Sequence, residues 1–281
     1  MVGLSRGQTL DLLARHDLAP RRALGQHFVV DPNTVERIAR LAEVGPGDRV
    51  VEVGAGLGSL TLALAATGAA VTAVEVDRGL VAVLREVVEP AGVTVVEADA
   101  MAVDWAGLLG EGPWALVANL PYNVATPLVA DLLDDVPAIT RMLVMVQREV
   151  GERLAAGPGE DAYGAVSVKV AYWATAQVVG RVPATVFVPR PDVESALVRI
   201  QRRPAPAVPP EVVDPDQLFA LVRAGFGQRR KMLRRSLAGV VPPEAFAAAG
   251  IRPEARAEEL GVEEWGRLAA CRRPSSGPPP S

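Results

Sequence analysis

Residues 49–59, RVVEVGAGLGS, join an apolar run to the start of a helical pattern. The valines of this run favour a buried strand. Gly54, Gly56 and Gly58 follow at once, and such a turn lets a ligand approach the backbone, with helix N–H groups directed at it. The dinucleotide fingerprint needs its third glycine where Ser59 stands, so the spacing suits a smaller ligand without a pyrophosphate. The stretch therefore predicts the first strand, turn and helix of an α/β fold.

The same alternation of strand and helix patterns continues along the first 200 residues. Between the expected strands, apolar positions recur at helical spacing. Strands are expected at residues 49–53, 70–74, 93–96, 114–118, 139–146, 166–173 and 195–200. Regular alternation of this kind predicts an α/β protein with a mostly parallel, doubly wound sheet.

Acidic residues follow two of the expected strands. Glu75 ends the second strand and Asp99 ends the third. In open α/β sheets, ligands bind at the carboxyl ends of the strands, where an acid can accept both hydroxyls of a ribose. A carboxylate at Asp99 can likewise accept a hydrogen bond from an adenine amino group. The alternative is that both acids only cap the helices that follow.

Asn119, Leu120, Pro121 and Tyr122 come directly after the fourth expected strand. Pro121 lacks an N–H group and ends that strand. The Asn119 side-chain oxygen and a freed backbone carbonyl can accept hydrogen bonds from an exocyclic amine, and Tyr122 offers a face for stacking on a nucleobase. The alternative is an ordinary strand-to-helix turn with an asparagine cap.

The composition narrows the class of protein. With 281 residues, 49% hydrophobic and 22% charged, the chain is expected to form one large and one small globular domain. Cys271 is the single cysteine, and with His16 and His27 as the only histidines we expect no disulfide, zinc site or iron–sulfur cluster. The chain opens with no secretory signal and is expected to be cytoplasmic, without a membrane span.

Charge and proline content mark a second domain. The net charge is −4, yet residues 199–235 carry nine basic and three acidic residues, which leaves −10 on the remainder. Residues 204–210 (PAPAVPP) form a linker by composition. We expect a catalytic domain at residues 1–204, a small helical domain at 205–273 and a disordered tail at 274–281. A basic segment can hold nucleic-acid phosphates, or it can be a solvated helix face.

The ordered set of glycine turn, Glu75, Asp99 and Asn119–Tyr122 resembles that of class I S-adenosylmethionine-dependent methyltransferases. Within that class, the sequence is similar to the KsgA-type (RsmA) ribosomal RNA adenine N6,N6-dimethyltransferases of bacteria over residues 18–270. The stretches that carry this resemblance are LGQHF (24–28), NLPYNVATPL (119–128), VQREV (146–150), YG (163–164), VFVPRP (186–191), VES (193–195) and FGQRRK (226–231).

The resemblance implies roles for individual residues. It assigns binding of S-adenosylmethionine to His27, Val29, Gly54, Gly56, Glu75, Asp99 and Asn119. It assigns catalysis to Asn119, Leu120, Pro121, Tyr122 and Phe187. It assigns contacts with RNA phosphates to Arg21, Arg22, Arg229, Arg230, Lys231 and Arg234. Members of the family commonly have Asn where this chain has His27 and Pro where it has Ala55, so a side-chain contact from position 27 to the cofactor is open.

The implied reaction is methyl transfer to N6 of two adjacent adenines in a hairpin loop near the 3′ end of 16S rRNA. The expected partner is small-subunit rRNA or an immature 30S particle, bound by a monomer without a metal. An Erm-type 23S rRNA methyltransferase is the nearest alternative, and Leu120 with the Pro189-Arg190-Pro191 loop disfavours it. A non-catalytic ribosome-assembly factor is a second alternative. A nicotinamide oxidoreductase is a third, against which the glycine spacing argues.

Overall fold

The computed structural model describes residues 2–21, 24–121 and 124–272. Contacts between Cα atoms divide the chain into two compact units. The first comprises residues 1–152 and 176–202, and the second comprises residues 153–175 and 203–281. The sequence predicts one boundary at residues 204–205, whereas these contacts group residues 153–175 with the helical part of the chain.

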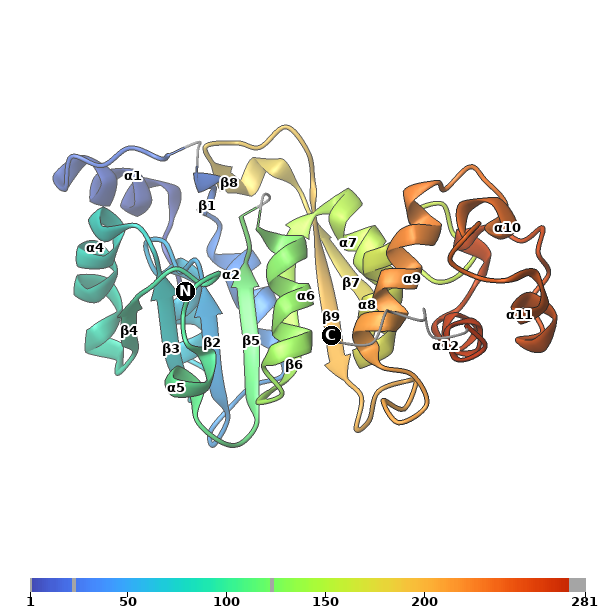
Figure 1. Cartoon of the computed structure of the whole chain (residues 1–281). Helices are drawn as coiled ribbons and strands as arrows, with labels where there is room; N and C mark the ends of the chain where they lie inside the picture. The colour runs from blue at the N-terminus through green and yellow to red at the C-terminus, as the bar shows by residue number, and fades with distance from the viewer. Residues whose placement is uncertain (1, 22–23, 122–123, 273–281) are drawn as a thin grey trace, which may run out of the picture. The chain divides into compact units, whose positions relative to one another are not determined.

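A seven-stranded sheet with the order β4-β3-β2-β5-β6-β9-β7 is central to the fold (Figure 1). The pairs β2–β3, β2–β5, β3–β4 and β5–β6 are parallel, and β6–β9 is antiparallel. The expected mostly parallel sheet is therefore confirmed. The strands are β2 (Arg49–Val53), β3 (Ala70–Glu75), β4 (Thr94–Glu97), β5 (Trp114–Asn119), β6 (Ile139–Gln147), β7 (Ala174–Val182) and β9 (Ser195–Arg202).

Helices cover both faces of this sheet, and Figure 1 shows α6 in front of it and α2 behind it. Asp31 and Asp77 begin α2 and α4, because each carboxylate accepts a hydrogen bond from a backbone N–H of the first turn. The helices of the first unit are α1 (Arg6–Arg15), α2 (Pro32–Leu41), α3 (Ser59–Ala65), α4 (Arg78–Val88), α5 (Trp105–Leu109) and α6 (Ala125–Asp135). Helix α7 (Arg148–Ala155) begins in the first unit and ends in the second.

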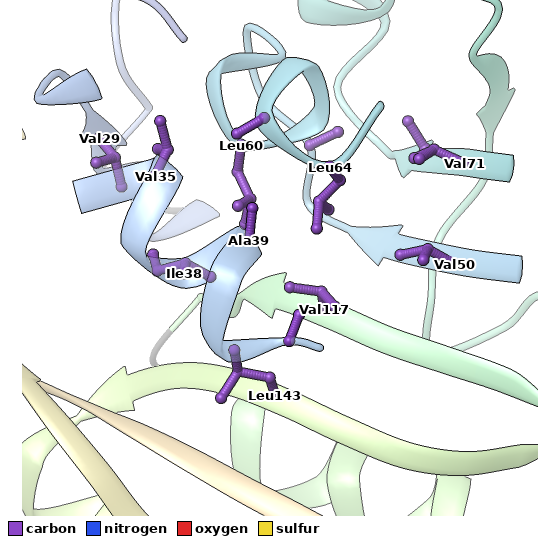
Figure 2. Packing of buried hydrophobic residues seen from close by; sticks show 14 of the residues in the cluster. Val29, Val35, Ile38, Ala39, Val50, Leu60, Leu64, Val71, Val117 and Leu143 are labelled. Atoms are coloured by element: carbon purple, nitrogen blue, oxygen red, sulfur yellow. The ribbon is translucent and has the colours of Figure 1, made fainter. Parts of the chain in front are cut away.

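The core of the first unit lies between the sheet and the helices α2 and α3 (Figure 2). Ile38 of α2 and Leu64 of α3 are almost completely buried there, as are Val50 and Val117 of the sheet. Every second residue of a strand points to the same face, so Val51 and Leu116 are buried against the opposite layer. The strands are apolar on both faces because helices cover both.

One element differs from the sequence prediction. Residues 166–173, expected as a strand from their alternating valines, form helix α8 (Ala165–Trp173), and the strand β7 begins only at Ala174. Val168 and Tyr172 are four residues apart, lie on one face of a helix and are both fully buried in the core of the second unit. Tertiary packing has decided this segment over its β propensity.

Two short strands form a sheet that the sequence analysis did not anticipate. Strand β1 (Phe28–Val29) pairs antiparallel with β8 (Phe187–Val188), so Phe28 lies opposite Val188 and Val29 opposite Phe187. A 3₁₀ helix at residues 184–186 precedes β8. This sheet joins the segment before α2 to a segment about 160 residues later in the chain.

The second unit is helical around a buried aromatic group that includes Tyr163, Phe246 and Trp265. The helices of the second unit are α8, α9 (Pro215–Gly227), α10 (Leu233–Ser236), α11 (Pro243–Ala248) and α12 (Val262–Ala270). Residues 229–232 form turns and a bridge, so α10 begins only at Leu233. Within the part of the chain that the structure describes, every helix is too short or too polar to cross a lipid bilayer.

Candidate functional site

A cavity of about 260 Å³ lies at the carboxyl ends of β2, β3 and β5 in the first unit. These strands are parallel neighbours, so the residues that follow them share one edge of the sheet. All seven residues assigned to the cofactor line this cavity, namely His27, Val29, Gly54, Gly56, Glu75, Asp99 and Asn119. Leu120 and Pro121, assigned to catalysis, line it as well. Tyr122, assigned to base stacking, lies outside the described residues.

The glycine turn forms one wall of the cavity. Gly56 adopts a positive φ of 60°, which directs its N–H toward the Glu75 carboxylate at 2.8 Å. Gly58, with φ of 87°, packs so closely on α4 that a Cβ atom would lie 2.5 Å from Val88 Cγ1. Both positions therefore require glycine, one for the path of the backbone and one for the space.

Glu75 is held rigidly at the end of β3. Its Oε1 accepts the N–H groups of Val76 and Asp77 at 3.0 and 2.9 Å, and its Oε2 accepts that of Gly56. The side chain is 5% exposed. Burial raises the pKa of Glu75, while the three backbone N–H groups act in the opposite direction. Its position and remaining acceptor capacity suit a donor such as a ribose hydroxyl.

Glu52 and Thr9 also line the cavity, and the sequence did not predict a role for either. Glu52 of β2 and Thr9 of α1 are 2% and 1% exposed, and within the described residues neither Glu52 Oε2 nor Thr9 Oγ1 has a hydrogen-bond partner. Burial raises the pKa of Glu52 to about 8, opposed by Thr61 and reinforced by the nearby Glu75. A charged residue among valines was the available signal for Glu52, whereas Thr9 had none.

Val76 and Met101 are large apolar side chains that are exposed, at 49% and 42%, and both line the cavity. Each follows one of the predicted acids, Glu75 or Asp99, by one or two residues. Asp99 itself accepts the N–H of Met101 at 2.9 Å. Exposed apolar groups beside hydrogen-bond acceptors suit a planar heterocycle that carries an amino group.

The backbone after β5 restricts which carbonyl can serve as an acceptor. The Pro121 carbonyl accepts the N–H groups of Val124 and Ala125 at 3.2 and 3.1 Å, at the start of α6. The Leu120 N–H donates to Met145 at 3.0 Å, but no donor to the Leu120 carbonyl is found among the residues the structure describes. Of the Leu120 and Pro121 carbonyls, that of Leu120 is therefore the one with acceptor capacity left within the described residues.

The Asn119 amide is oriented by the N-terminal segment. Its Nδ2 donates to the backbone carbonyl of His27 at 3.0 Å, so its Oδ1 is the arm left for a ligand. Phe187, assigned to catalysis, is placed differently: its ring is 1% exposed in the core and does not line the cavity. Stacking of Phe187 on a base would therefore require its ring to become exposed.

The basic residues assigned to RNA come from both units of the chain. Arg21 lies 3.5 Å from Asp77 in the first unit, and Arg22 is outside the described residues. In the second unit, Arg229 pairs with Glu258 at 3.5 Å and Arg234 with Glu254 at 3.3 Å.

Two further basic residues of the second unit are differently placed. Arg230 and Lys231 are exposed, and neither has an ion pair with any residue in the described part of the chain. Among the assigned cations that the structure describes, these two side chains are therefore the ones available to an external phosphate.

Other arginines of the basic segment 199–235 serve the fold. Arg202 donates to the carbonyls of Leu132, Leu133 and Val136, which end helix α6, and to that of Ile139, at 2.9–3.2 Å. A guanidinium at a helix C-terminus satisfies its last carbonyls and its dipole. Arg199 pairs with Glu43 at 2.7 Å. The positive charge of the segment thus overstates the charge offered to a partner.

Comparison with known proteins identifies a family and close relatives. The sequence matches the family described as Ribosomal RNA adenine dimethylase over residues 18–271. The protein named Ribosomal RNA small subunit methyltransferase A from Kineococcus radiotolerans is 49% identical over 279 residues, covering 96% of this chain and 91% of its own length. That of Moorella thermoacetica is 45% identical over 278 residues, covering 94% and 96%. The crystal structure of the 23S rRNA methyltransferase ErmE is similar with a TM-score of 0.69 and 27% identity, over 87% of this chain and 98% of that one.

Proposed function

Because this chain belongs to the ribosomal RNA adenine dimethylase family, we propose that it transfers methyl groups from S-adenosylmethionine to N6 of two adjacent adenines in a hairpin loop near the 3′ end of 16S rRNA. Its fold is that of the class I S-adenosylmethionine-dependent methyltransferases. The observation that carries the proposal is the convergence of Glu75, Asp99 and Asn119–Pro121 on one cavity. Relatives at 45–49% identity carry the small-subunit name, which disfavours the 23S alternative.

The cavity residues fit S-adenosylmethionine group by group. In the proposal, Glu75 accepts the ribose hydroxyls, and Asp99 accepts the adenine amino group between the apolar side chains of Val76 and Met101. The buried Glu52 Oε2, which has no partner among the described residues, suits a cationic donor, and the amino-acid end of the cofactor provides one. Binding of the cofactor would thus supply the hydrogen bond that this buried oxygen needs.

The reaction requires activation of a poor nucleophile, because the lone pair of adenine N6 is delocalised into the ring. When bound, S-adenosylmethionine supplies a methyl group on a sulfonium. In the proposal, Asn119 Oδ1 and the Leu120 carbonyl accept the two N6 hydrogens and direct the lone pair at the methyl carbon. The N–C bond forms as the C–S bond breaks, which leaves neutral S-adenosylhomocysteine, and the surplus proton passes to water. Positioning and electrostatics replace a strong base.

The substrate base must leave its stack to reach this edge, which favours a hairpin loop over a duplex. Tyr122 remains the proposed stacking partner. The buried Phe187 pairs with Val29 of β1, and we propose a structural role for it there. It would contact the base only if its ring became exposed. Arg230, Lys231 and Arg22 are proposed to hold phosphates, with Arg21, Arg229 and Arg234 contributing if RNA displaces their acidic partners.

The experiment is methyl transfer from labelled S-adenosylmethionine to small subunits that lack the modification, to large subunits and to free rRNA, with the product nucleosides resolved. We expect N6,N6-dimethyladenosine in the small-subunit RNA. Dimethyladenosine found only in large-subunit RNA would support the Erm-type alternative. Cofactor binding without transfer to any substrate would support an assembly factor.

Methyl transfer and sedimentation test the finer parts of the proposal. We propose a cytoplasmic monomer that acts on an immature 30S particle. Faster transfer to such particles than to naked 16S rRNA would support the particle as substrate. A sedimentation coefficient that does not change with protein concentration would support the monomer.

A further inference from the structure

His27 lines the cavity and makes two hydrogen bonds, one as an acceptor through its backbone and one as a donor through its ring. Its backbone carbonyl accepts the Asn119 Nδ2–H group at 3.0 Å, and its ring Nδ1 lies 2.7 Å from the carbonyl oxygen of Pro189. A carbonyl oxygen can only accept, so Nδ1 must carry the proton and donate. One residue thus contacts both the amide proposed to bind the substrate amine and the loop that follows β8.

This contact extends a ladder that already joins the two segments. Phe28 pairs with Val188 and Val29 with Phe187, and the Val30 N–H donates to the Val186 carbonyl at 2.8 Å. A two-stranded pairing of this length is marginal without further support. The ring of His27 supplies one more link at the end nearest to Asn119.

We propose that His27 is a positioning residue. Its ring is fixed to the Pro189 loop, and this holds the backbone carbonyl of His27 in place against the Asn119 amide. The amide of Asn119 is planar, so fixing its nitrogen arm also fixes the Oδ1 arm that receives the substrate amine. The side chain of residue 27 therefore acts on the orientation of the acceptor rather than on the cofactor. This inference rests on the proposed role of Asn119.

The asparagine that the family commonly has at position 27 provides the matched variant. An Asn side chain also carries an N–H donor and can reach a nearby carbonyl, whereas Ala has none. In His27→Ala we expect kcat to fall about tenfold to a hundredfold, as for other losses of alignment, with the affinity for S-adenosylmethionine changed by no more than about threefold. His27→Asn should recover most of kcat. His16→Ala, at a histidine that pairs with Glu86 away from the cavity, is the control.

The measurements are kcat and KM for methyl transfer, calorimetric titration with S-adenosylmethionine, and amide hydrogen exchange of residues 183–190. Unchanged kcat in His27→Ala would overturn the proposal. So would a loss of cofactor affinity that accounts for the whole defect, or equal defects in the Ala and Asn variants.

Hydrogen exchange separates this inference from the proposed function, because it needs no activity. His27→Ala should exchange faster than the wild type in residues 183–190, and His27→Asn should not. If the wild type transfers no methyl group, the proposed function fails, while this difference in exchange still supports the link between the His27 ring and the Pro189 loop. Equal exchange in all three proteins overturns that link whatever their activity.

Discussion

The edge of the sheet and the basic segment 199–235 were both singled out from sequence, and the structure treats them in opposite ways. The polar residues at the carboxyl ends of β3, β4 and β5 converge on one cavity although they are separated by about 20 residues or more. The arginines of the basic segment, which are close in sequence, are divided between helix capping, internal ion pairs and solvent. The position of a residue relative to a strand thus predicted which residues gather at one site better than closeness along the chain did.

The reason is topological. In a parallel sheet, every strand ends at the same edge, so a residue just after a strand has its location fixed before any tertiary contact is known. A charged residue on a helix or in a loop has no such constraint, and its partner can come from anywhere. Arg202 illustrates this, since it caps helix α6, which ended 67 residues earlier in the chain.

The largest effect should come from the cavity. Asn119→Ala removes the acceptor that we propose to orient the substrate amine, and loss of one such group lowers kcat by about 10² to 10³. The affinity for S-adenosylmethionine should change far less. Single-turnover transfer and calorimetric titration on the same preparation test this. A variant with normal turnover would remove Asn119 from the mechanism.

The next largest effect should come from an arginine of the basic segment that serves the fold. Arg202→Met keeps the length of the side chain but leaves the carbonyls at the end of α6 without their donor. We expect the free energy of unfolding to fall by about 2–3 kcal/mol, since the variant cannot form these hydrogen bonds from a charged donor. Denaturant unfolding measures it.

Arg230→Met is the matched control, because Arg230 is exposed and its stability contribution should be close to zero. If both variants lose equal stability, the division of the segment into structural and available arginines is wrong. If neither loses stability, the capping role of Arg202 is wrong.

The sequence predicted those parts of the fold and site that have local signals, and it missed those that depend on contacts between distant segments. The strands β2 to β6 and the residues Glu75, Asp99 and Asn119 were placed correctly, because apolar periodicity and strand ends are local signals. Helix α8 was missed because its valines alternate as in a strand, and only the core of the second unit shows which face is buried. Thr9 and the β1–β8 pair depend on contacts between distant segments, for which no local pattern exists.

Glu52 predicts how stability depends on pH. Its folded pKa of about 8 lies above the ordinary value of 4.5, so the folded protein holds a proton that the unfolded chain releases in this range. Stability should therefore fall as pH rises from about 4.5 to about 8 and level off above. Glu52→Gln should make this fall shallower but not abolish it, because the pKa of Glu75 is raised as well.

Thermal unfolding of the protein without cofactor, recorded from about pH 5 to about pH 8.5, tests this expectation. Glu244→Gln, at an exposed position of α11, is the control and should leave the pH dependence unchanged. Parallel curves for the wild type and Glu52→Gln would show that Glu52 is not protonated in the folded state.

A smaller effect, on RNA binding, should come from the available cations. Replacing Arg230 and Lys231 by Ala should reduce the slope of log Kd against log salt by about 0.7–0.9 for each RNA phosphate that the variant no longer neutralises. Arg199→Gln should leave the slope unchanged, because Arg199 is paired with Glu43 within the first unit. Filter binding of a 16S hairpin at several salt concentrations measures the slopes. Equal slopes in all the proteins would place the phosphate-binding residues elsewhere.

The smallest effect should come from Thr9, the cavity residue without a sequence signal. Thr9→Val keeps the shape of the side chain and removes a buried hydroxyl that lacks a partner among the described residues. Without cofactor, the variant should be more stable than the wild type by up to about 1 kcal/mol, because an unsatisfied polar group is no longer buried. With S-adenosylmethionine bound, the gain should shrink or reverse if the hydroxyl contacts the cofactor. A gain of the same size with and without cofactor would mean that Thr9 belongs to the packing of α1 and not to the binding site.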